Sequence, residues 1–304
     1  MGDMESQVSF LNELFEAQIL IPSGVPGLYG RSATFENILN AFDAFVSRAG
    51  APDRPSLVRF PPLIDRATFQ RSGYMKNMPQ LAGTVHSFMG GQPEHVQLIQ
   101  ELESGADWSH HQKMTDVVLT PAACYPLYPS QSGEIGDTPR TFDVQSYCFR
   151  HEPSQDPARM QVFRMREFVQ LGSAEAVRSF RSSWFDRGQE LFARVGLEVH
   201  AAPANDPFFG RTGRMLAANQ REQELKYEMV VPIASEAPTA IMSLNYHQDL
   251  FGSTFGIRRL GNPAHTACVG FGLERITLAL LKKHGLQPAT WPEAVRTTLF
   301  PNGL

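Results

Sequence analysis

The chain has 304 residues and a net charge of −4, and 42% of its residues are hydrophobic and 19% charged. This length corresponds to about two domains or one large α/β domain, and the composition excludes a disordered or fibrous protein. The negative charge provides no general attraction to nucleic acid, although a local basic patch is compatible with it. Because the chain has no run of about 18 apolar residues and its N-terminus is not a signal peptide, we expect a cytoplasmic protein that does not bind a membrane.

The first half of the chain predicts short helices and strands. Thr34 can cap one of the helices. Pro61 and Pro62 lack the amide hydrogen that a sheet ladder needs, which favours an edge or a bulge there. From hydrophobic spacing and residue type, the predicted elements are helices over 5–18, 35–48 and 93–103 and strands over 57–64 and 116–120.

The second half predicts four strands and three helices. The last helix should end at Gly285, with basic residues in its final turn. The strands are expected over 142–152, 160–172, 229–233 and 239–247, and the helices over about 175–195, 213–228 and 270–284. Helices and strands intermix with hairpin-like spacing, which favours an α+β fold in which helices flank a mainly antiparallel sheet.

The two central strands carry a cluster of polar and aromatic residues. Side chains alternate along a strand, so Arg150 and Glu152 share one face, as do Phe163 and Glu167. Arg159 lies in the connection between the strands. An arginine binds phosphate with two parallel hydrogen bonds, and an aromatic ring can stack on a base. A salt-bridged hairpin with one core phenylalanine fits the same pattern.

A glycine-rich segment precedes the last predicted helix. Gly270 and Gly272 permit close backbone approach, and Arg275 follows within the first turns of the helix. The segment is not a dinucleotide fingerprint, because the sixth position is arginine and no βαβ unit begins there. Tight packing of a helix against the sheet would explain the glycines equally well.

The three cysteines are too widely separated to suggest a disulfide framework, which leaves buried thiols or metal ligands. Cys124 follows a strand, and we expect Cys268 at the start of the last helix. Two thiolates and one carboxylate would leave the fourth position of a catalytic zinc site open, and Cys148 competes as a ligand. His110 and His111 are adjacent, so we expect their side chains to point apart at the surface.

Taken together, these segments resemble the catalytic core of class II aminoacyl-tRNA synthetases, and of seryl-tRNA synthetase in particular. The CFRHE stretch at 148–152 matches the core of motif 2, Arg159 its loop arginine and Phe163 its adenine-stacking ring. The segment 270–275 resembles motif 3, and 35–64 resembles motif 1, the usual dimer element. The resemblance runs from about residue 28 to the end.

Two departures from the seryl enzymes indicate the subfamily. The chain has no counterpart of their N-terminal coiled-coil arm, and no anticodon-binding domain follows motif 3. The zinc-dependent seryl enzymes of methanogens use Cys, Glu and Cys as ligands, and Cys124, Glu167 and Cys268 fall at those positions. A truncated, zinc-bearing homologue of this kind resembles the amino acid:carrier protein ligases.

This resemblance implies ATP-dependent activation of glycine or alanine as an aminoacyl-adenylate, followed by transfer to the phosphopantetheine thiol of a carrier protein. Zn²⁺ and Mg²⁺ are the implied cofactors, and the nearest acidic residue before Asn245 is Glu236. The implied catalytic residues are Arg150 and Arg275, with Glu152, Arg159 and Phe163 completing the ATP site, Lys226, Glu228 and Asn245 in the amino-acid pocket, and Cys124, Glu167 and Cys268 on the metal.

We therefore expect one catalytic domain over 1–304, with a helical N-terminal extension over about 1–27. A helical insertion over about 205–228, with arginines at 211, 214 and 221, is a candidate docking site for an acidic carrier protein, although a solvated helix face is an alternative. The expected partners are ATP, a small amino acid, a phosphopantetheinylated carrier and a second copy of the chain, but not tRNA. Alternative functions are a minimal synthetase that charges tRNA, an adenylating enzyme with a small-molecule acceptor, and a non-catalytic regulator.

Overall fold

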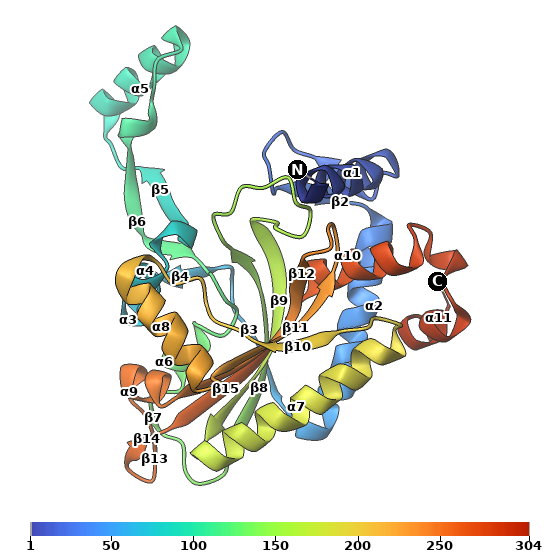
Figure 1. Cartoon of the computed structure of the whole chain (residues 1–304). Coiled ribbons are helices and arrows are strands. Elements are labelled where there is room, and N and C mark those ends of the chain that lie inside the picture. Colours follow the sequence, from blue (N-terminus) through green and yellow to red (C-terminus); the bar gives the residue numbers. More distant parts are fainter. Residues whose placement is uncertain (1, 304) are drawn as a thin grey trace.

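A seven-stranded sheet forms the centre of the fold in the computed structural model, which describes residues 2–303 (Figure 1). Strand β3 runs parallel to β8, and the other neighbouring strands are antiparallel. In spatial order the strands are β10 (His200–Pro203), β11 (Lys226–Pro232), β12 (Pro238–Gln248), β15 (His265–Gly272), β9 (Val162–Gly172), β8 (Arg140–Phe149) and β3 (Ser56–Arg59). The expected α+β fold with a mainly antiparallel sheet is confirmed.

Three long helices pack on one face of this sheet: α2 (Ala33–Gly50), α7 (Ala174–Arg194) and α10 (Leu273–His284). The ring of Trp184 in α7 stacks on Phe168 of β9 with centroids 4.5 Å apart. The N-terminal helix α1 (Gly2–Glu16) and the C-terminal helix α11 (Glu293–Leu299) contribute side chains to the same core. The N-terminal extension expected from the sequence is therefore packed against the domain.

The other face of the sheet carries a second, smaller core. It is covered by the short helices α6 (Leu127–Ser130) and α9 (Leu250–Phe255). Tyr128 of α6 and Phe251 of α9 stack with ring centroids 4.0 Å apart. The loop that contains Cys124 joins this core, which holds the loop against the sheet.

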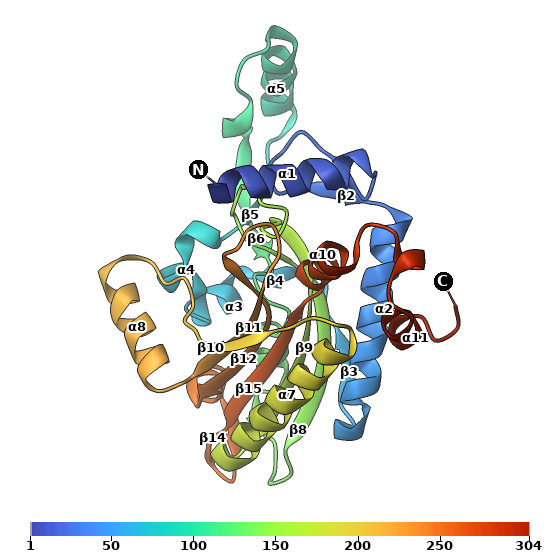
Figure 2. The ribbon, with the colours of Figure 1, turned by 45° about the vertical axis from the view of Figure 1, so that its right-hand side comes forward.

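An arm projects from the body of the molecule (Figures 1 and 2). It consists of β5 (Thr84–Phe88), α5 (Gln92–Ser104) and β6 (Gln112–Leu119), and β6 also pairs with β4 (Leu63–Asp65) near the body. The prediction of one continuous strand over 57–64 is wrong, because these residues contribute to two strands, β3 and β4, that belong to different sheets. Phe60, Pro61 and Pro62 separate β3 from β4, as the missing amide hydrogens of two prolines require.

The helix predicted over 270–284 begins three residues later, at Leu273. Residues 265–272 form β15 instead, so Cys268, Gly270 and Gly272 lie on a strand rather than on a helix. Strand β15 is buried between β9 and β12, and such a strand lacks the alternation that would reveal it. The expected end of the helix is confirmed, since the Gly285 amide caps the Leu281 carbonyl.

Two further boundaries differ from the sequence-based predictions. Helix α8 spans Gly210–Glu222, and β11 begins at Lys226, so the helix predicted over 213–228 ends too late. Glu224, with φ of 50°, turns the chain between them. Ser32, and not Thr34, caps α2 by accepting the Phe35 amide at 3.4 Å.

The remaining elements are short. They are β1 (Leu20–Pro22), β2 (Tyr29–Arg31), α3 (Arg66–Arg71), α4 (Tyr74–Asn77), β7 (Gly133–Glu134), β13 (Ile257–Arg259) and β14 (Asn262–Pro263), with single 3₁₀ turns at 51–53, 79–81, 109–111 and 288–290. Among the described residues, no helix combines the length and the apolar character needed to cross a membrane.

Candidate active site

Two adjoining cavities open over the sheet on the side of the small core. The first is lined by the motif-like residues Arg150, Phe163 and Arg275. The second contains the candidate metal ligands and reaches as far as α8. Residues shared by both linings make the two cavities one continuous site: they are Arg150, Met165, Lys226, Glu228 and Ser243.

Arg150 lies between the two cavities. Strand β8 ends at Phe149, so Arg150 and Glu152 belong to the connection that follows it. The partly buried Arg150 guanidinium lies 5.4 Å from the centroid of the Phe163 ring and donates from Nε to the Pro121 carbonyl at 3.3 Å. Its remaining N–H groups are available to a ligand in either cavity.

Arg275 lies in the first turn of α10. Its guanidinium donates to the carbonyls of Ala158 at 2.8 Å and Ala240 at 3.0 Å. Burial, together with the nearby charges of Arg150 and Arg159, lowers the pKa of Arg275 to about 10. Arg150, Lys226 and Arg275 line this cavity together with three carboxylates, of which Glu274 is already paired with Arg31 and Arg164. The guanidinium groups of Arg150 and Arg275 offer paired donors suited to an anionic ligand.

Arg159 occupies the turn that joins β8 to β9. Its side chain is half-exposed and lies 3.7 Å from both Glu152 and Asp156. Both ion pairs are long and open to water, so they constrain the guanidinium weakly. This arrangement leaves Arg159 free to move toward a polyphosphate.

The three candidate metal ligands converge in the second cavity. Cys124 lies in the loop after β6, Glu167 on β9 and Cys268 on β15, and all three are buried. One ligand atom from each lies within 4.8 Å of the others. Glu167 Oε1 accepts the Cys124 amide at 3.0 Å, which holds the loop on the strand. Cys148, the competing ligand, is buried apart from this group, with its thiol against the Ser146 carbonyl.

The electrostatics of this group suit a cation. Burial raises the pKa of Cys124 and raises that of Glu167 to about 8. A hydrogen bond from the Cys124 thiol, aided by His247, lowers the pKa of Cys268. A set of two sulfur ligands and one oxygen ligand matches zinc, and three protein ligands leave a fourth position for a substrate. The residues present therefore fit Zn²⁺.

A second layer of side chains surrounds Cys268. Asn245 Nδ2 lies 3.3 Å from the Cys268 sulfur, and His247 Nε2 lies 3.6 Å from it. The other ring nitrogen of His247 contacts the Thr266 hydroxyl at 3.0 Å. The sequence analysis singled out Asn245 but missed His247, although two residues along a strand share a face, which is the signal that would have found it.

Lys226 and Glu228 project from β11 between the two cavities. Lys226 Nζ lies 2.7 Å from Asp206 and 3.0 Å from Glu228. Asp206 also accepts from Gln220 of α8 at 2.9 Å, and its amide donates to the Gln220 side chain at 2.7 Å. Asp206 therefore links α8 to the site, and its loop position offered no periodic signal from which to predict it.

Glu236 lies outside the site, whereas Tyr74 lies within it. Glu236, the nearest acidic residue before Asn245, is exposed in the turn between β11 and β12 and lines neither cavity. Tyr74, which the sequence analysis also missed, lines the second cavity, and burial raises its pKa to about 12. Its buried hydroxyl has no hydrogen-bond partner among the described residues.

The antiparallel sheet with one parallel edge strand and its flanking helices form the fold of class II aminoacyl-tRNA synthetase catalytic domains. The structure matches seryl-tRNA synthetase of M. kandleri, solved in complex with A. aeolicus tRNASec, with a TM-score of 0.82 and 21% identity. The match covers 97% of this chain and 61% of that chain. The expected fold is confirmed.

Curated relatives identify the family within that class. Amino acid–acyl-carrier-protein ligases 2 and 1 of Bradyrhizobium diazoefficiens are 46% and 41% identical to this chain over 280 residues. These matches cover 91% of this chain and 84% and 86% of the relatives. No family model matches the sequence. The chain belongs to the amino acid–acyl-carrier-protein ligases and is a ligase, which confirms the resemblance stated above.

Proposed function

We propose that this ligase activates glycine or alanine with ATP and transfers the aminoacyl group to the phosphopantetheine thiol of a carrier protein. The observation that carries the proposal is the continuity of the two cavities. An arginine-rich cavity suited to phosphates adjoins a cavity that contains Cys124, Glu167 and Cys268, and Arg150 lines both. The preference for a small amino acid rests on the family resemblance.

In the first step, a carboxylate oxygen of the amino acid attacks the α-phosphorus of ATP. The new bond joins that oxygen to phosphorus, and pyrophosphate leaves with the electrons of the broken bond. Arg150 would contact the α-phosphate and the carboxylate, because its guanidinium borders both cavities. Arg275 and Arg159 would hold the β- and γ-phosphates. Catalysis then depends on orientation and charge neutralisation, and Mg²⁺ is expected with the nucleotide.

The adenine is proposed to lie beside Phe163 and Glu152. The Phe163 ring offers a stacking surface in the first cavity, and Glu152 lines the same cavity with its carboxylate. A carboxylate can accept a hydrogen bond from the adenine amino group. This placement directs the triphosphate toward Arg275, which lines the same cavity.

Cys124, Glu167 and Cys268 are proposed to hold Zn²⁺. When bound, this ion would offer its open coordination position to the neutral α-amino group of the substrate and so discriminate against hydroxy acids. Lys226, Glu228 and Asn245 would line the remainder of the amino-acid pocket. Their position in the second cavity, beside the metal ligands, supports this assignment.

In the second step, the carrier thiol attacks the activated carbonyl carbon. The sulfur–carbon bond forms, the thiol proton is released, and the bond from the carbonyl carbon to the phosphate oxygen breaks as AMP leaves. The second cavity extends from the metal ligands to Leu216, Asn219 and Gln220 of α8. This continuity supports entry of the phosphopantetheine arm alongside α8, with an acidic carrier seated on the exposed arginines of that helix.

We further propose a homodimer formed through β3 and α2. Strand β3 is the edge of the central sheet, and Leu57 on it is 67% exposed. An apolar edge strand of this kind is a ready pairing surface. The expected cytoplasmic location stays a prediction.

The test is ATP–pyrophosphate exchange measured with each of the twenty amino acids in turn, on protein of known zinc content. We expect exchange with one small amino acid and little or none with the hydroxy-acid analogue. Arg275→Ala should remove exchange while leaving a folded protein. Exchange that survives in Arg275→Ala would contradict the nucleotide-binding assignment, and no exchange by the zinc-loaded wild type would favour a regulatory protein.

Acceptor specificity is tested with the same enzyme and the amino acid found by exchange. A phosphopantetheinylated carrier should become aminoacylated, whereas the same carrier without phosphopantetheine and bulk tRNA should not. Charging of tRNA would overturn the proposal in favour of a minimal synthetase. Efficient formation of a free aminoacyl thioester with pantetheine, but none with carrier, would favour a small-molecule acceptor.

A further inference from the structure

The projecting arm holds a second group of metal-ligating side chains, separate from the group that contains the cysteines. His111 Nε2 lies 2.9 Å from one oxygen of Glu101, and His110 Nε2 lies 3.5 Å from the other. The two imidazole rings lie with their centroids 4.1 Å apart. The expectation that these adjacent histidines point apart is therefore wrong, because the 3₁₀ turn at 109–111 directs both rings toward the end of α5.

We propose that Glu101, His110 and His111 form a second metal site, which takes a divalent transition-metal ion such as Zn²⁺. Ligand atoms about 2.0–2.1 Å from a tetrahedral zinc lie roughly 3.3 Å from one another. The two nitrogen-to-oxygen separations, 2.9 Å to one Glu101 oxygen and 3.5 Å to the other, are both close to that value. All three residues have a ligand atom within 4.8 Å of the others.

A hydrogen bond on the far side of one ring supports metal binding. His110 Nδ1 lies 3.2 Å from the Asp107 carbonyl, which can only accept. The Nδ1–H tautomer is therefore favoured, and it leaves the Nε2 lone pair facing Glu101. Metal-bound histidines characteristically donate their other ring N–H to a carbonyl or carboxylate in this way.

The nature of the ligands selects the kind of ion. Two nitrogen ligands select zinc, nickel or copper over magnesium and calcium, which prefer oxygen.

The construction of the arm gives such an ion a role. Helix α5 lies wholly within the described residues, and none of its side chains is buried. Val96, Ile99 and Leu102 of α5 are between 39% and 53% exposed. A helix without a core of its own needs another restraint, and Glu101 joined to His110 and His111 would tie its last turns to the start of β6 (Figure 2).

Metal content of zinc-loaded, desalted protein tests the proposal. Glu101→Gln combined with His111→Asn should lose one zinc equivalent per chain relative to wild type. His95→Asn is the matched control, because His95 lies on the same helix against Phe88 and outside the group. The comparison needs no activity assay, so it stands whether or not the proposed adenylation is correct. Equal zinc content in wild type and the double variant would overturn the site.

Cobalt substitution separates the two sites spectroscopically. Thiolate charge-transfer absorption would belong to Cys124 and Cys268, so it should persist in the Glu101→Gln, His111→Asn variant while part of the visible d–d absorption disappears. Amide hydrogen exchange in α5 of the wild type gives a measurement that needs no variant. Slower exchange upon zinc addition is expected, and exchange that is unchanged by zinc, or zinc bound too weakly to survive desalting, means an adventitious ion only and contradicts the proposal.

Discussion

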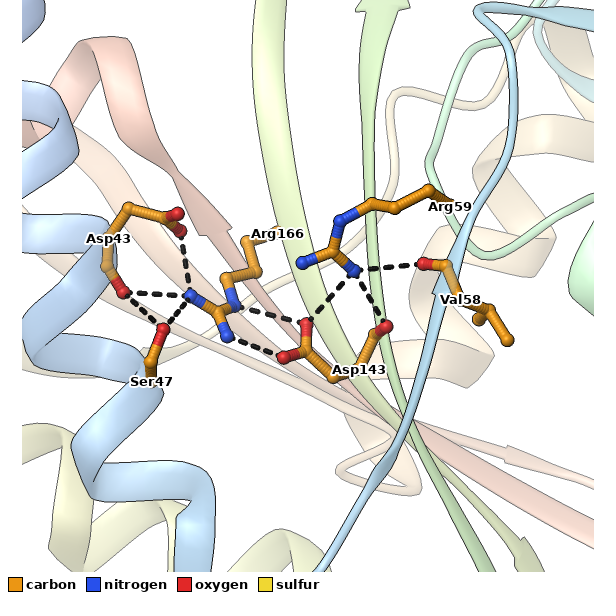
Figure 3. Close-up of polar contacts among 6 residues, drawn as sticks. All are labelled: Asp43, Ser47, Val58, Arg59, Asp143 and Arg166. Atoms are coloured by element: carbon orange, nitrogen blue, oxygen red, sulfur yellow. Dashed lines mark hydrogen bonds and ion pairs between the residues drawn. The ribbon is translucent and has the colours of Figure 1, made fainter.

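Arg166 and Glu167 are neighbours on β9, and their side chains lie on opposite faces of the central sheet. Glu167 faces the cysteines, whereas Arg166 faces α2, where it donates to Asp43 at 2.9 Å and to Ser47 at 2.6 Å. Arg166 also forms a two-point ion pair with Asp143 of β8, at 3.1 and 2.5 Å (Figure 3). Strand β9, which carries the candidate metal ligand Glu167, is thus anchored on its opposite face by the ion pairs of Arg166.

Removing the carboxylate from this network should destabilise the fold. Asp143 accepts hydrogen bonds from Arg166 and from Arg59 of β3, and the Arg166 side chain is 3% exposed (Figure 3). Asp143→Asn would remove the two-point partner of Arg166 and leave Asp43 as its remaining carboxylate, which costs about 1.5–3 kcal/mol. Arg59→Met is the control, because Arg59 is half-exposed and should cost about 1 kcal/mol or less. Urea unfolding measures both, and equal losses for the two variants would contradict this ranking.

The metal assignment predicts different behaviour for the three cysteines. Cys124→Ser and Cys268→Ser should each reduce zinc bound at the cysteine site and abolish amino-acid-dependent exchange, while the circular dichroism of the fold is retained. Cys148→Ser is the matched control, since Cys148 is equally buried but lies outside the ligand group. Unchanged thiolate-to-cobalt absorption in both single variants would refute the ligand assignment.

The parts of this site that were predictable from the sequence depend on regular local geometry. Alternation along β9 correctly placed Phe163 and Glu167 on one face, and the same two residues line the two adjoining cavities. The resemblance to two motifs predicted that Arg150 and Arg275 belong to one site. Both residues line the first cavity, although 125 positions separate them in the chain. Such placements are predictable because alternation along a strand and the order of motifs can be recognised in the sequence alone, without knowledge of tertiary contacts.

The parts that were missed depend on tertiary contact or on burial from both sides. Strand β15 is apolar on both faces, so its period could not distinguish it from the helix that follows. Asp206 lies in a loop and gains its role from Lys226 and Gln220, which approach it in space. The contact of His110 with Glu101 closes a turn between a helix and a strand, and side-chain spacing alone does not determine such turns.

His247 should act as a positioning residue for the metal ligand Cys268. Its Nε2 lies 3.6 Å from the sulfur and its Nδ1 is held by Thr266. Loss of an outer contact of this kind weakens metal binding by about 10–100-fold. We expect His247→Ala to raise the zinc dissociation constant of the cysteine site by that factor in chelator competition. His265→Asn, altered on the neighbouring strand at a histidine paired with Tyr246, should leave it unchanged, and an unaltered affinity in His247→Ala would exclude this role.

The docking proposal for α8 predicts a separation of the two half-reactions. Arg211 and Arg214 are exposed on α8. Reversing both to glutamate should raise the KM for an acidic carrier about tenfold or more, because complementary charge governs encounter. ATP–pyrophosphate exchange should stay at the wild-type rate. Lys282→Glu combined with Lys283→Glu, at two exposed positions in the last turn of α10, makes the same change in net charge and is the control. A carrier KM that the arginine reversals leave unchanged would remove α8 as the docking site.

Asp206 should contribute stability that depends on pH. Burial alone would raise its pKa, but the charge and hydrogen bond of Lys226 lower the pKa to about 2. Because the folded-state pKa lies below the unfolded value, the carboxylate stabilises the fold above about pH 4, and this contribution is lost as the pH falls toward 2.

The Asp206 side chain is 34% exposed, so after screening we expect Asp206→Asn to cost about 1 kcal/mol at pH 7. The same variant should raise the amino-acid KM, since Lys226 loses one of its two carboxylate partners and keeps only Glu228. Unfolding measured from pH 2.5 to 7 tests this, with Asp116→Asn, a 91% exposed carboxylate, as the control. A cost for Asp206→Asn that is as large at pH 2.5 as at pH 7 would contradict the ionised link between Asp206 and Lys226.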